Sequence, residues 1–385
     1  MNKIERLIQE LCPNGVEWKE VGDVTQIKKG KQLNKSLLTD DGTYPAYNGG
    51  QFESGRTDRY NVDENTTIIS QGGASAGFVN FITTKFWANA HCYFLLPDKK
   101  IINNKYLYHF IKMKQNNLME SQYGSGIPAL KVDSISKIKI PIPPLEIQEE
   151  IVKILDKFTD YVTELTTELT LRQKQYHYYR DKLLSLENEE FESKKLGEVC
   201  NFIRGNGLQK KDFVEKGFPV IHYGQIYTKY GFSARDTISF ANGEIYNKLR
   251  KAKRGDIIMA TTSENTEDLG KSVVWEGEQE VGISGDSYII QTSQNPRFIN
   301  YYLQSIHFQL QKEKKVTGTK VIRINSKDMV NFDIKVPSLL RQKQIVSILD
   351  NFDVLTSNLV FGLPKEIELR KKQYEYYRDK LLSFD

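Results

Sequence analysis

Two stretches of this chain occur twice, and this duplication constrains the fold more than any other feature. Residues 142–158 read IPPLEIQEEIVKILDKF, and residues 336–352 read VPSLLRQKQIVSILDNF. Pro143 and Pro337 are equivalent, so the separation of these copies is 194 residues. A second pair, residues 175–185 (QYHYYRDKLLS) and 373–383 (QYEYYRDKLLS), is separated by 198 residues. Long-range self-similarity of this kind predicts two copies of one structural unit.

The segments that precede the repeated stretches are also related, although more faintly. Residues 19–24 (KEVGDV) correspond to residues 194–199 (KKLGEV), and Gly30 corresponds to Gly205. Each half contains short β-rich runs followed by a helical stretch. The expected strands are at 67–70, 92–95, 256–259 and 287–290, and the expected helices are at 104–114 and 297–312.

Each repeated stretch also predicts a long helix with a coiled-coil seam. Apolar or large residues between Ile151 and Leu183 recur at alternating steps of four and three. The second helix starts the same way at Ile345, but two successive steps of four mark a stutter near Gly362. We expect a kink or a short break there, with Pro364 in the first turn of the resumed helix. Each arm of about 40 residues would be about 60 Å long.

The predicted fold class is α/β (α+β), with two similar mixed domains. An antiparallel pairing of the two long helices would relate the domains by a pseudo-twofold axis. The expected boundaries are 1–143 for the first domain, 144–190 for the first helix, 191–336 for the second domain and 337–385 for the second helix. The alternative is that each helix packs only on its own globular domain. A chain of 385 residues is long enough for two or three domains with cores of their own.

Composition and motifs argue against a membrane protein or an enzyme. Charged residues make up 27% of the chain, and no apolar run approaches the roughly 18 residues of a membrane span. The N-terminal stretch carries acidic residues where a secretory signal has an apolar core, so we expect a cytoplasmic protein. Cys12, Cys92 and Cys200 are too scattered for a zinc cluster, and the five histidines lack metal spacing. We expect neither a catalytic residue nor a metal site.

Polar loops at matching positions of both halves are candidates for nucleic-acid contacts. The net charge of +5 permits polyanion binding without requiring it. Lysine and arginine neutralise phosphates, amide side chains can pair with base edges, and glycine allows close backbone approach. Taken singly, each loop is better explained as an ordinary solvated turn, and the recurrence at equivalent places in both halves is what favours a binding role. The candidate residues are Lys28, Lys29, Lys31, Gln122, Tyr123, Ser125, Arg204, Asn206, Thr317, Thr319 and Lys320.

Aromatic and arginine residues crowd the end of each long helix. Such residues are typical anchors of protein interfaces. The candidates for partner binding are Tyr176, Tyr178, Arg180, Tyr374, Tyr376 and Arg378. Packing of these side chains on the nearby globular domain is the alternative.

The arrangement resembles the specificity subunit of type I restriction-modification systems. In that family a Pro-Pro-Leu-x-x-Gln-x-x-Ile pattern follows a target-recognition domain; here it stands at 143–151 and, with Ser338 replacing the second proline, at 337–345. The segments starting Gly22-Asp23 and Gly197-Glu198 also resemble the family's domain starts. The resemblance covers essentially the whole chain. It rests on the order and spacing of motifs that are individually weak.

The resemblance implies a non-catalytic subunit that reads a divided DNA sequence, one half with each target-recognition domain. Two methyltransferase subunits would bind it and modify adenines, and restriction (motor-nuclease) subunits would add ATP-dependent cleavage. S-adenosylmethionine, ATP and magnesium would then belong to the partners. Two alternatives remain open from the sequence: a coiled-coil scaffold that binds only protein, and a self-sufficient restriction enzyme, which the missing catalytic motifs disfavour.

Overall fold

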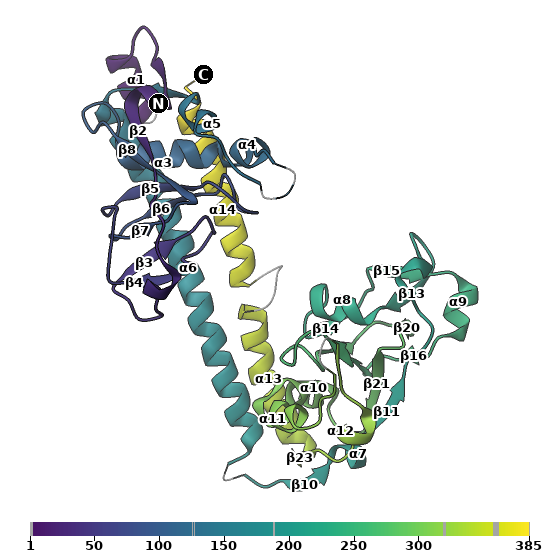
Figure 1. Ribbon diagram of the computed structural model, residues 1–385. Helices are drawn as coiled ribbons and strands as arrows, with labels where there is room; N and C mark the ends of the chain where they lie inside the picture. The colour runs from purple at the N-terminus through teal and green to yellow at the C-terminus, as the bar shows by residue number, and fades with distance from the viewer. Residues whose placement is uncertain are drawn as a thin grey trace. The chain divides into compact units, whose positions relative to one another are not determined.

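The computed structural model divides the chain into two compact units. Unit 1 comprises Met1–Glu164 and Glu368–Asp385, and unit 2 comprises Leu165–Ile367. The structure describes residues 3–124, 126, 128–187, 189–318, 321–356 and 362–384. Both units therefore draw on residues from the long helices as well as on a globular part (Figure 1).

The globular part of unit 1 is built on a four-stranded sheet of order β2-β8-β5-β6. Its strands are β2 (Thr25–Lys29), β5 (Thr66–Ser70), β6 (Val79–Ile82) and β8 (Cys92–Pro97). A three-stranded sheet contains β3 (Tyr44–Tyr47), β4 (Gly55–Thr57) and β7 (Trp87–Ala88), while β1 (Glu17–Glu20) pairs with β9 (Lys139–Ile142). The helices are α1 (Lys3–Leu11), α2 (Val21–Val24), η1 (Lys35–Leu37), α3 (Asn104–Met113), α4 (Gln115–Glu120) and α5 (Asp133–Ser136).

Unit 2 repeats this plan around a five-stranded sheet of order β11-β21-β17-β19-β14. Its strands are β11 (Cys200–Arg204), β14 (Ser233–Ala234), β17 (Ile257–Ala260), β19 (Ser272–Trp275) and β21 (Ser287–Thr292). A second sheet contains β12 (Phe213–Val214), β13 (Phe218–Ile221), β15 (Ser239–Ala241), β16 (Lys251–Ala252) and β20 (Val281–Ile283). Two further pairs are β10 (Glu192–Lys195) with β23 (Asp333–Val336) and β18 (Thr262–Ser263) with β22 (Ile322–Arg323). The helices are α7 (Leu196–Val199), η2 (Lys210–Asp212), α8 (Tyr223–Thr228), α9 (Gly243–Lys248), α10 (Pro296–Gln304), α11 (Ile306–Glu313) and α12 (Ser326–Met329).

The repeat predicted from sequence is confirmed by strand order. In unit 1 the order is β2-β8-β5-β6, and in unit 2 the equivalent strands follow as β11-β21-β17-β19. The four expected strands coincide with β5, β8, β17 and β21. The single helix expected at 297–312 is wrong, because α10 ends at Gln304 and α11 begins at Ile306. Ser305 interrupts it, since its hydroxyl accepts the backbone N–H of Phe308 and caps a new helix.

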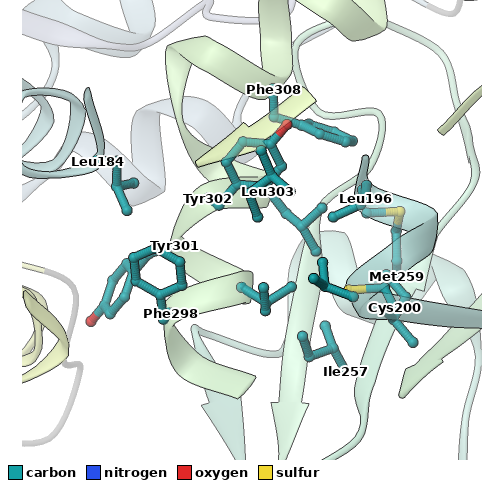
Figure 2. Close-up of a cluster of buried hydrophobic side chains, with 14 of the residues drawn as sticks. Leu184, Leu196, Cys200, Ile257, Met259, Phe298, Tyr301, Tyr302, Leu303 and Phe308 are labelled. Carbon is teal, nitrogen blue, oxygen red and sulfur yellow. The ribbon is translucent and has the colours of Figure 1, made fainter. Parts of the chain in front are cut away.

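Each unit has its own buried cluster, to which the globular part and a long helix both contribute. In unit 1, Ile151 and Leu155 of the first long helix pack with Tyr106 and Phe110 of α3. In unit 2, Leu184 of the first long helix belongs to one buried cluster with Leu303 and Phe308 of α10 and α11, as Figure 2 shows. A long amphipathic helix is therefore stabilised at each end by burial against a domain.

The long helices are α6 (Leu145–Ser185), α13 (Leu339–Thr356) and α14 (Leu363–Leu382). Within unit 1, Phe158 stacks on Tyr377 with ring centroids 5.2 Å apart. Within unit 2, Tyr179 stacks on Phe352 at 5.8 Å. Phe158 precedes Tyr179 along α6, whereas the partner of Phe158, Tyr377, follows the partner of Tyr179, Phe352. Contacts in this reversed order are those of antiparallel helices. Pro364 lies in the first turn of α14, as predicted; residues 357–361, where the stutter falls, lie outside the described residues.

A buried glutamine attaches each long helix to its globular part. The Gln148 side-chain oxygen accepts the backbone N–H of Asn103 at 2.7 Å, and its amide nitrogen donates to the carbonyls of Ile101 and Pro143. Gln342 repeats this arrangement: it accepts the N–H of Asn295 at 3.0 Å and donates to Gln294 Oε1 and to the carbonyl of Pro337. Asn103 and Asn295 are the N-caps of α3 and α10. The glutamine in the repeated motif therefore has a structural role, since it attaches the long helix to the globular part by hydrogen bonds.

An aspartate two turns further along each helix makes a second attachment. Asp156 accepts hydrogen bonds from His109 Nε2 at 3.1 Å and from Lys105. Asp350 accepts from the hydroxyl of Tyr301 at 2.6 Å and from the guanidinium of Arg297. Equivalent positions of α3 and α10 therefore bind the aspartate of the repeated helix. The side chains at these positions are lysine and histidine in α3 and arginine and tyrosine in α10.

Candidate functional site

The matched glycines that follow β2 and β11 allow close packing of backbone segments. The N–H of Gly30 donates to the carbonyl of Cys92 and the N–H of Gly205 to that of Ser287, both at 2.9 Å. A Cβ atom at Gly30 would overlap the carbonyl oxygen of Asn89, and one at Gly205 would overlap that of Ser284. These contacts explain both glycines without any ligand. They also hold the end of each first strand against the segment that leads into β8 or β21.

The second matched loop is a small hairpin in both units. Tyr123 and Ala129 exchange two backbone hydrogen bonds at 2.9 Å, and Thr317 and Arg323 do the same at 2.9 and 3.1 Å. Gly124 (φ 100°) and Gly318 (φ 106°), which follow the first residue of each hairpin, both have positive φ. Only glycine adopts this conformation without strain. Ser125, Thr319 and Lys320, which were predicted to contact DNA, lie outside the described residues.

A third segment brings the two matched loops of unit 1 together. The N–H of Gln71 donates to the carbonyl of His91 at 2.8 Å, and the carbonyl of Gln71 accepts the N–H of Leu130 at 2.7 Å. His91 belongs to the segment against which Gly30 packs, and Leu130 follows the hairpin. The predicted loops are therefore neighbours at the edge of the sheet where β2 ends and β8 begins.

Unit 2 assembles its loops in the same way. The N–H of Thr261 donates to the carbonyl of Asp286 at 3.0 Å, and the carbonyl of Thr261 accepts the N–H of Ile324 at 3.2 Å. We define the loop cluster as the described residues of 28–32, 71–73, 89–92 and 122–130 in unit 1, and of 204–209, 222–224, 261–263, 284–287 and 317–324 in unit 2. Each unit thus presents one composite surface made from segments distant in sequence.

The predicted residues of the loop cluster divide into exposed side chains and structural ones. Lys28, Lys29, Lys31, Tyr123, Arg204 and Thr317 are exposed. Gln122 instead donates through Nε2 to the carbonyl of Ala76 at 2.7 Å. Asn206 donates to the carbonyl of Lys248 at 2.8 Å and accepts the N–H of Arg250 at 2.7 Å, although its residue surface is exposed. The polar groups of these two amides already brace their own loops, so the exposed cations are the better candidates for ligand contacts.

A polar cleft opens in the loop cluster of unit 2. Residues that line it include Arg204, Gln209, His222, Tyr223, Ser284 and Asp286. Burial, together with the positive charge of Lys210, lowers the pKa of His222. Because Nδ1 of His222 accepts the N–H of Gly224 at 3.2 Å, its proton lies on Nε2. The cleft therefore combines hydrogen-bond donors with a carboxylate acceptor.

Sequence reasoning missed the functional potential of His91, His222 and Asp286. The histidines entered the sequence prediction only as metal ligands, which their spacing disfavours, and Asp286 carried no prediction. Their placement depends on backbone hydrogen bonds between β-strands and loops far apart in sequence. The single available signal was position: His91 immediately precedes β8, and Asp286 immediately precedes the equivalent strand β21.

The tyrosines and arginines at the helix ends fall into two groups. Tyr176 and Arg180 are buried within unit 2, and the hydroxyl of Tyr374 lies 2.9 Å from His109 Nδ1 in unit 1. Arg378 is half-buried beside Tyr374, with its guanidinium carbon 5.6 Å from the ring centroid. These four residues pack within their own units, as in the alternative stated above. Tyr178 and Tyr376, by contrast, are 60% and 62% exposed.

The described residues offer no grouping of His, Cys, Asp and Glu suited to a metal ion. Burial raises the pKa of Cys92 to about 11 and that of Cys200 to about 12, which disfavours the reactive thiolate. Among the described helices, none combines the length and hydrophobicity needed to cross a bilayer. Among the sites predicted from the sequence, the loop clusters and the exposed tyrosines remain as candidates for function.

Comparison with known proteins places the whole chain among similar sequences. A family model described as a type I restriction modification DNA specificity domain matches residues 13–172 and again residues 188–369. The Escherichia coli type I restriction enzyme EcoR124I/EcoR124II specificity subunit is 31% identical, with 100% of this chain and 97% of the relative covered. A putative type I specificity subunit of Haemophilus influenzae is also 31% identical, with 96% of each chain covered.

Solved structures share this fold. The crystal structure of a type I restriction-modification S subunit from M. genitalium superposes with a TM-score of 0.57 at 21% identity, covering 96% of each chain. A chain from a structural study of type I complex assembly and conformational transition gives a TM-score of 0.56 at 17% identity, covering 96% of this chain and 98% of that one. At these identities the likeness supports the fold alone.

Proposed function

This chain belongs to the type I restriction-modification DNA specificity family, and from that premise we propose that its two units read the two halves of one divided DNA sequence. The protein is a non-catalytic DNA specificity subunit of such a system. The observation that supports a divided site is the duplicated loop cluster, which occurs once in each unit with the same backbone hydrogen bonds. Two equivalent surfaces of different side-chain chemistry suit two half-sites of different sequence.

Exposed cations in each cluster supply the charge that a DNA contact needs. Lys28, Lys29 and Lys31 are exposed in unit 1, and Arg204 is exposed in unit 2. Cations near the backbone position a protein on the duplex, while polar groups on base edges give specificity. We therefore propose that the loop clusters face the DNA grooves. The pKa of His222 is lowered, so this residue would act there as a neutral donor.

We propose that two methyltransferase subunits bind the exposed helix surfaces around Tyr178 and Tyr376. These tyrosines are equivalent in the repeat, which suits two copies of the same partner. Restriction subunits would join the assembled complex. In this proposal S-adenosylmethionine, ATP and magnesium are bound by the partners, and the complex works in the cytoplasm.

Selection of DNA duplexes from a random pool tests the proposed function. The full-length chain, assembled with its methyltransferase subunits, should enrich one sequence with two specified parts and an unspecified gap. The methylome of cells that carry this complex should show adenine methylation in the same sequence. Binding without sequence preference would instead support the alternative of a protein scaffold.

A further inference from the structure

The loop cluster of each unit contains a pair of side chains whose places are equivalent in the two units. Lys29 and Arg204 are the last residues of β2 and β11. His91 and Asp286 each immediately precede the strand that pairs with it, β8 or β21. Each unit therefore has one residue at the end of its first strand and one just before the strand that pairs with it. The pair is Lys and His in unit 1 and Arg and Asp in unit 2.

The Arg204 side chain is positioned by its own unit but keeps much of its donor capacity. Its Nε–H donates to the carbonyl of Gly285 at 3.2 Å, which holds the guanidinium at the residue that precedes Asp286. Arg204 is exposed, Asp286 is half-exposed, and both line the polar cleft. Within the described ranges, neither residue forms an ion pair. The terminal guanidinium nitrogens and the carboxylate are thus available to a ligand.

The carboxylate decides what kind of ligand fits. A cleft that bound only a phosphate would gain from Arg204 but would lose from repulsion by Asp286. A base edge that offers both acceptors and a donor satisfies both side chains. In the major groove, guanine presents the acceptors O6 and N7, and its paired cytosine presents the donor N4. A guanidinium and a carboxylate that line the same cleft are complementary to that pattern.

Resting on the proposed function, we propose that Arg204 and Asp286 together read one G·C base pair in the half-site bound by unit 2. The terminal N–H groups of Arg204 donate to O6 and N7 of the guanine, and the Asp286 carboxylate accepts from N4 of the cytosine. Lys29 and His91 hold the equivalent position in unit 1. Their different chemistry gives the other half-site a different preference there.

The test compares variants in selection from a duplex pool that is randomised over both half-sites. It uses the full-length chain assembled with its methyltransferase subunits. Asp286→Asn keeps the shape of the side chain, and Arg204→Gln replaces the guanidinium with a shorter, neutral amide. Each should reduce discrimination at one base pair by about 10- to 100-fold. Every other specified position should stay unchanged. Arg254→Gln is the matched control, because Arg254 is also an exposed arginine of unit 2 but lines a different cleft.

Several results would overturn this assignment. One is that both variants keep the wild-type preference at every G·C pair of the selected sequence. Another is a uniform weakening on all sequences with a smaller salt dependence, which would make Arg204 a phosphate contact. A wild-type complex that shows no sequence preference at all would overturn the proposed function itself, and that result is distinguishable from a change confined to the variants.

Discussion

The side-chain oxygen of Gln148 accepts the backbone N–H of Asn103 at 2.7 Å, and so links the first turns of α6 to the N-cap of α3. The two residues are 45 positions apart. Gln148 is completely buried, and its side chain makes three hydrogen bonds within the protein. The link explains why a polar residue occupies the otherwise apolar face of the repeated helix.

Replacement of this glutamine should destabilise its unit. Gln148→Leu leaves the N–H of Asn103 and two carbonyls without their partner, at a cost of about 1–3 kcal/mol per unsatisfied group. Chemical denaturation should show the loss, and hydrogen exchange should place it in α3. Gln342→Leu should act on α10 instead. Gln173→Leu, on an exposed face of α6, serves as the control and should leave stability within about 0.5 kcal/mol of wild type.

Mild acid should loosen unit 1 through His109. Burial lowers the pKa of His109, although its hydrogen bond to Asp156 opposes this. The unfolded chain therefore binds more protons than the folded chain between the folded pKa and the ordinary value of about 6.5. The contribution of His109 to stability is complete above that value and is lost as the pH falls below it. Hydrogen exchange of α3 from pH 7.5 to 5 measures this.

A substitution separates His109 from other acid effects. The His109→Asn variant should be less stable at neutral pH, but its stability should change less between pH 7.5 and 5. Asp156 responds at lower pH: burial raises its pKa, and the hydrogen bonds from His109 and Lys105 outweigh this and lower it. Its contribution is therefore lost only below about pH 4. An unchanged pH profile in His109→Asn would contradict the assignment.

Lysines of the first loop cluster should contribute to binding without choosing the sequence. Lys28→Ala and Lys31→Ala each remove one exposed charge. If each lysine contacts a phosphate, the slope of log K against log salt should fall by about one for each variant, and the selected sequence should stay the same. Lys174→Ala, an exposed position of α6, is the control. Affinity measured from 50 to 200 mM salt checks the prediction, and unaltered slopes would refute it.

The exposed helix tyrosines should matter for assembly, whereas the buried one should matter for folding. Tyr178→Asp and Tyr376→Asp should impair co-purification of the methyltransferase while circular dichroism stays unchanged. Tyr176→Asp should unfold part of unit 2, because Tyr176 packs in its buried cluster. Normal co-purification of the Tyr178 and Tyr376 variants would show that neither tyrosine anchors the partner.

A tandem repeat within α6 predicts how the gap in the DNA site is set. Thr163–Thr166 and Thr167–Thr170 both read TELT. Deletion of Thr167–Thr170 shortens the helix by about 6 Å and changes its rotation by about 40°. The preferred gap between half-sites should become shorter, while the half-site sequences stay the same because no loop cluster changes. Methylome sequencing of cells that carry the deletion with its methyltransferase tests both parts. An active complex with altered half-sites and an unchanged gap would refute the prediction.

Local patterns in the sequence predicted the elements of the fold, but contacts between distant segments determined the site. The repeat and the spacing from Ile151 to Leu183 were sufficient to predict the long helices. The break at Ser305 was missed because the amphipathic pattern continues through this residue. The serine hydroxyl nevertheless accepts a backbone N–H and caps a new helix there. Asp286 could not be found, since its place in the same cleft as Arg204 depends on pairing between β11 and β21.

Both ends of the chain contribute to the buried cluster of unit 1. Ile4 and Leu7 of α1 belong to it, and so does Leu382 of α14. A ribosome therefore completes all of unit 2 before it has synthesised the last segment of unit 1. Domains usually fold in the order of their synthesis. Here the unit that is begun first is finished after unit 2, so the nascent chain exposes an unfilled apolar surface on unit 1 until α14 has been synthesised.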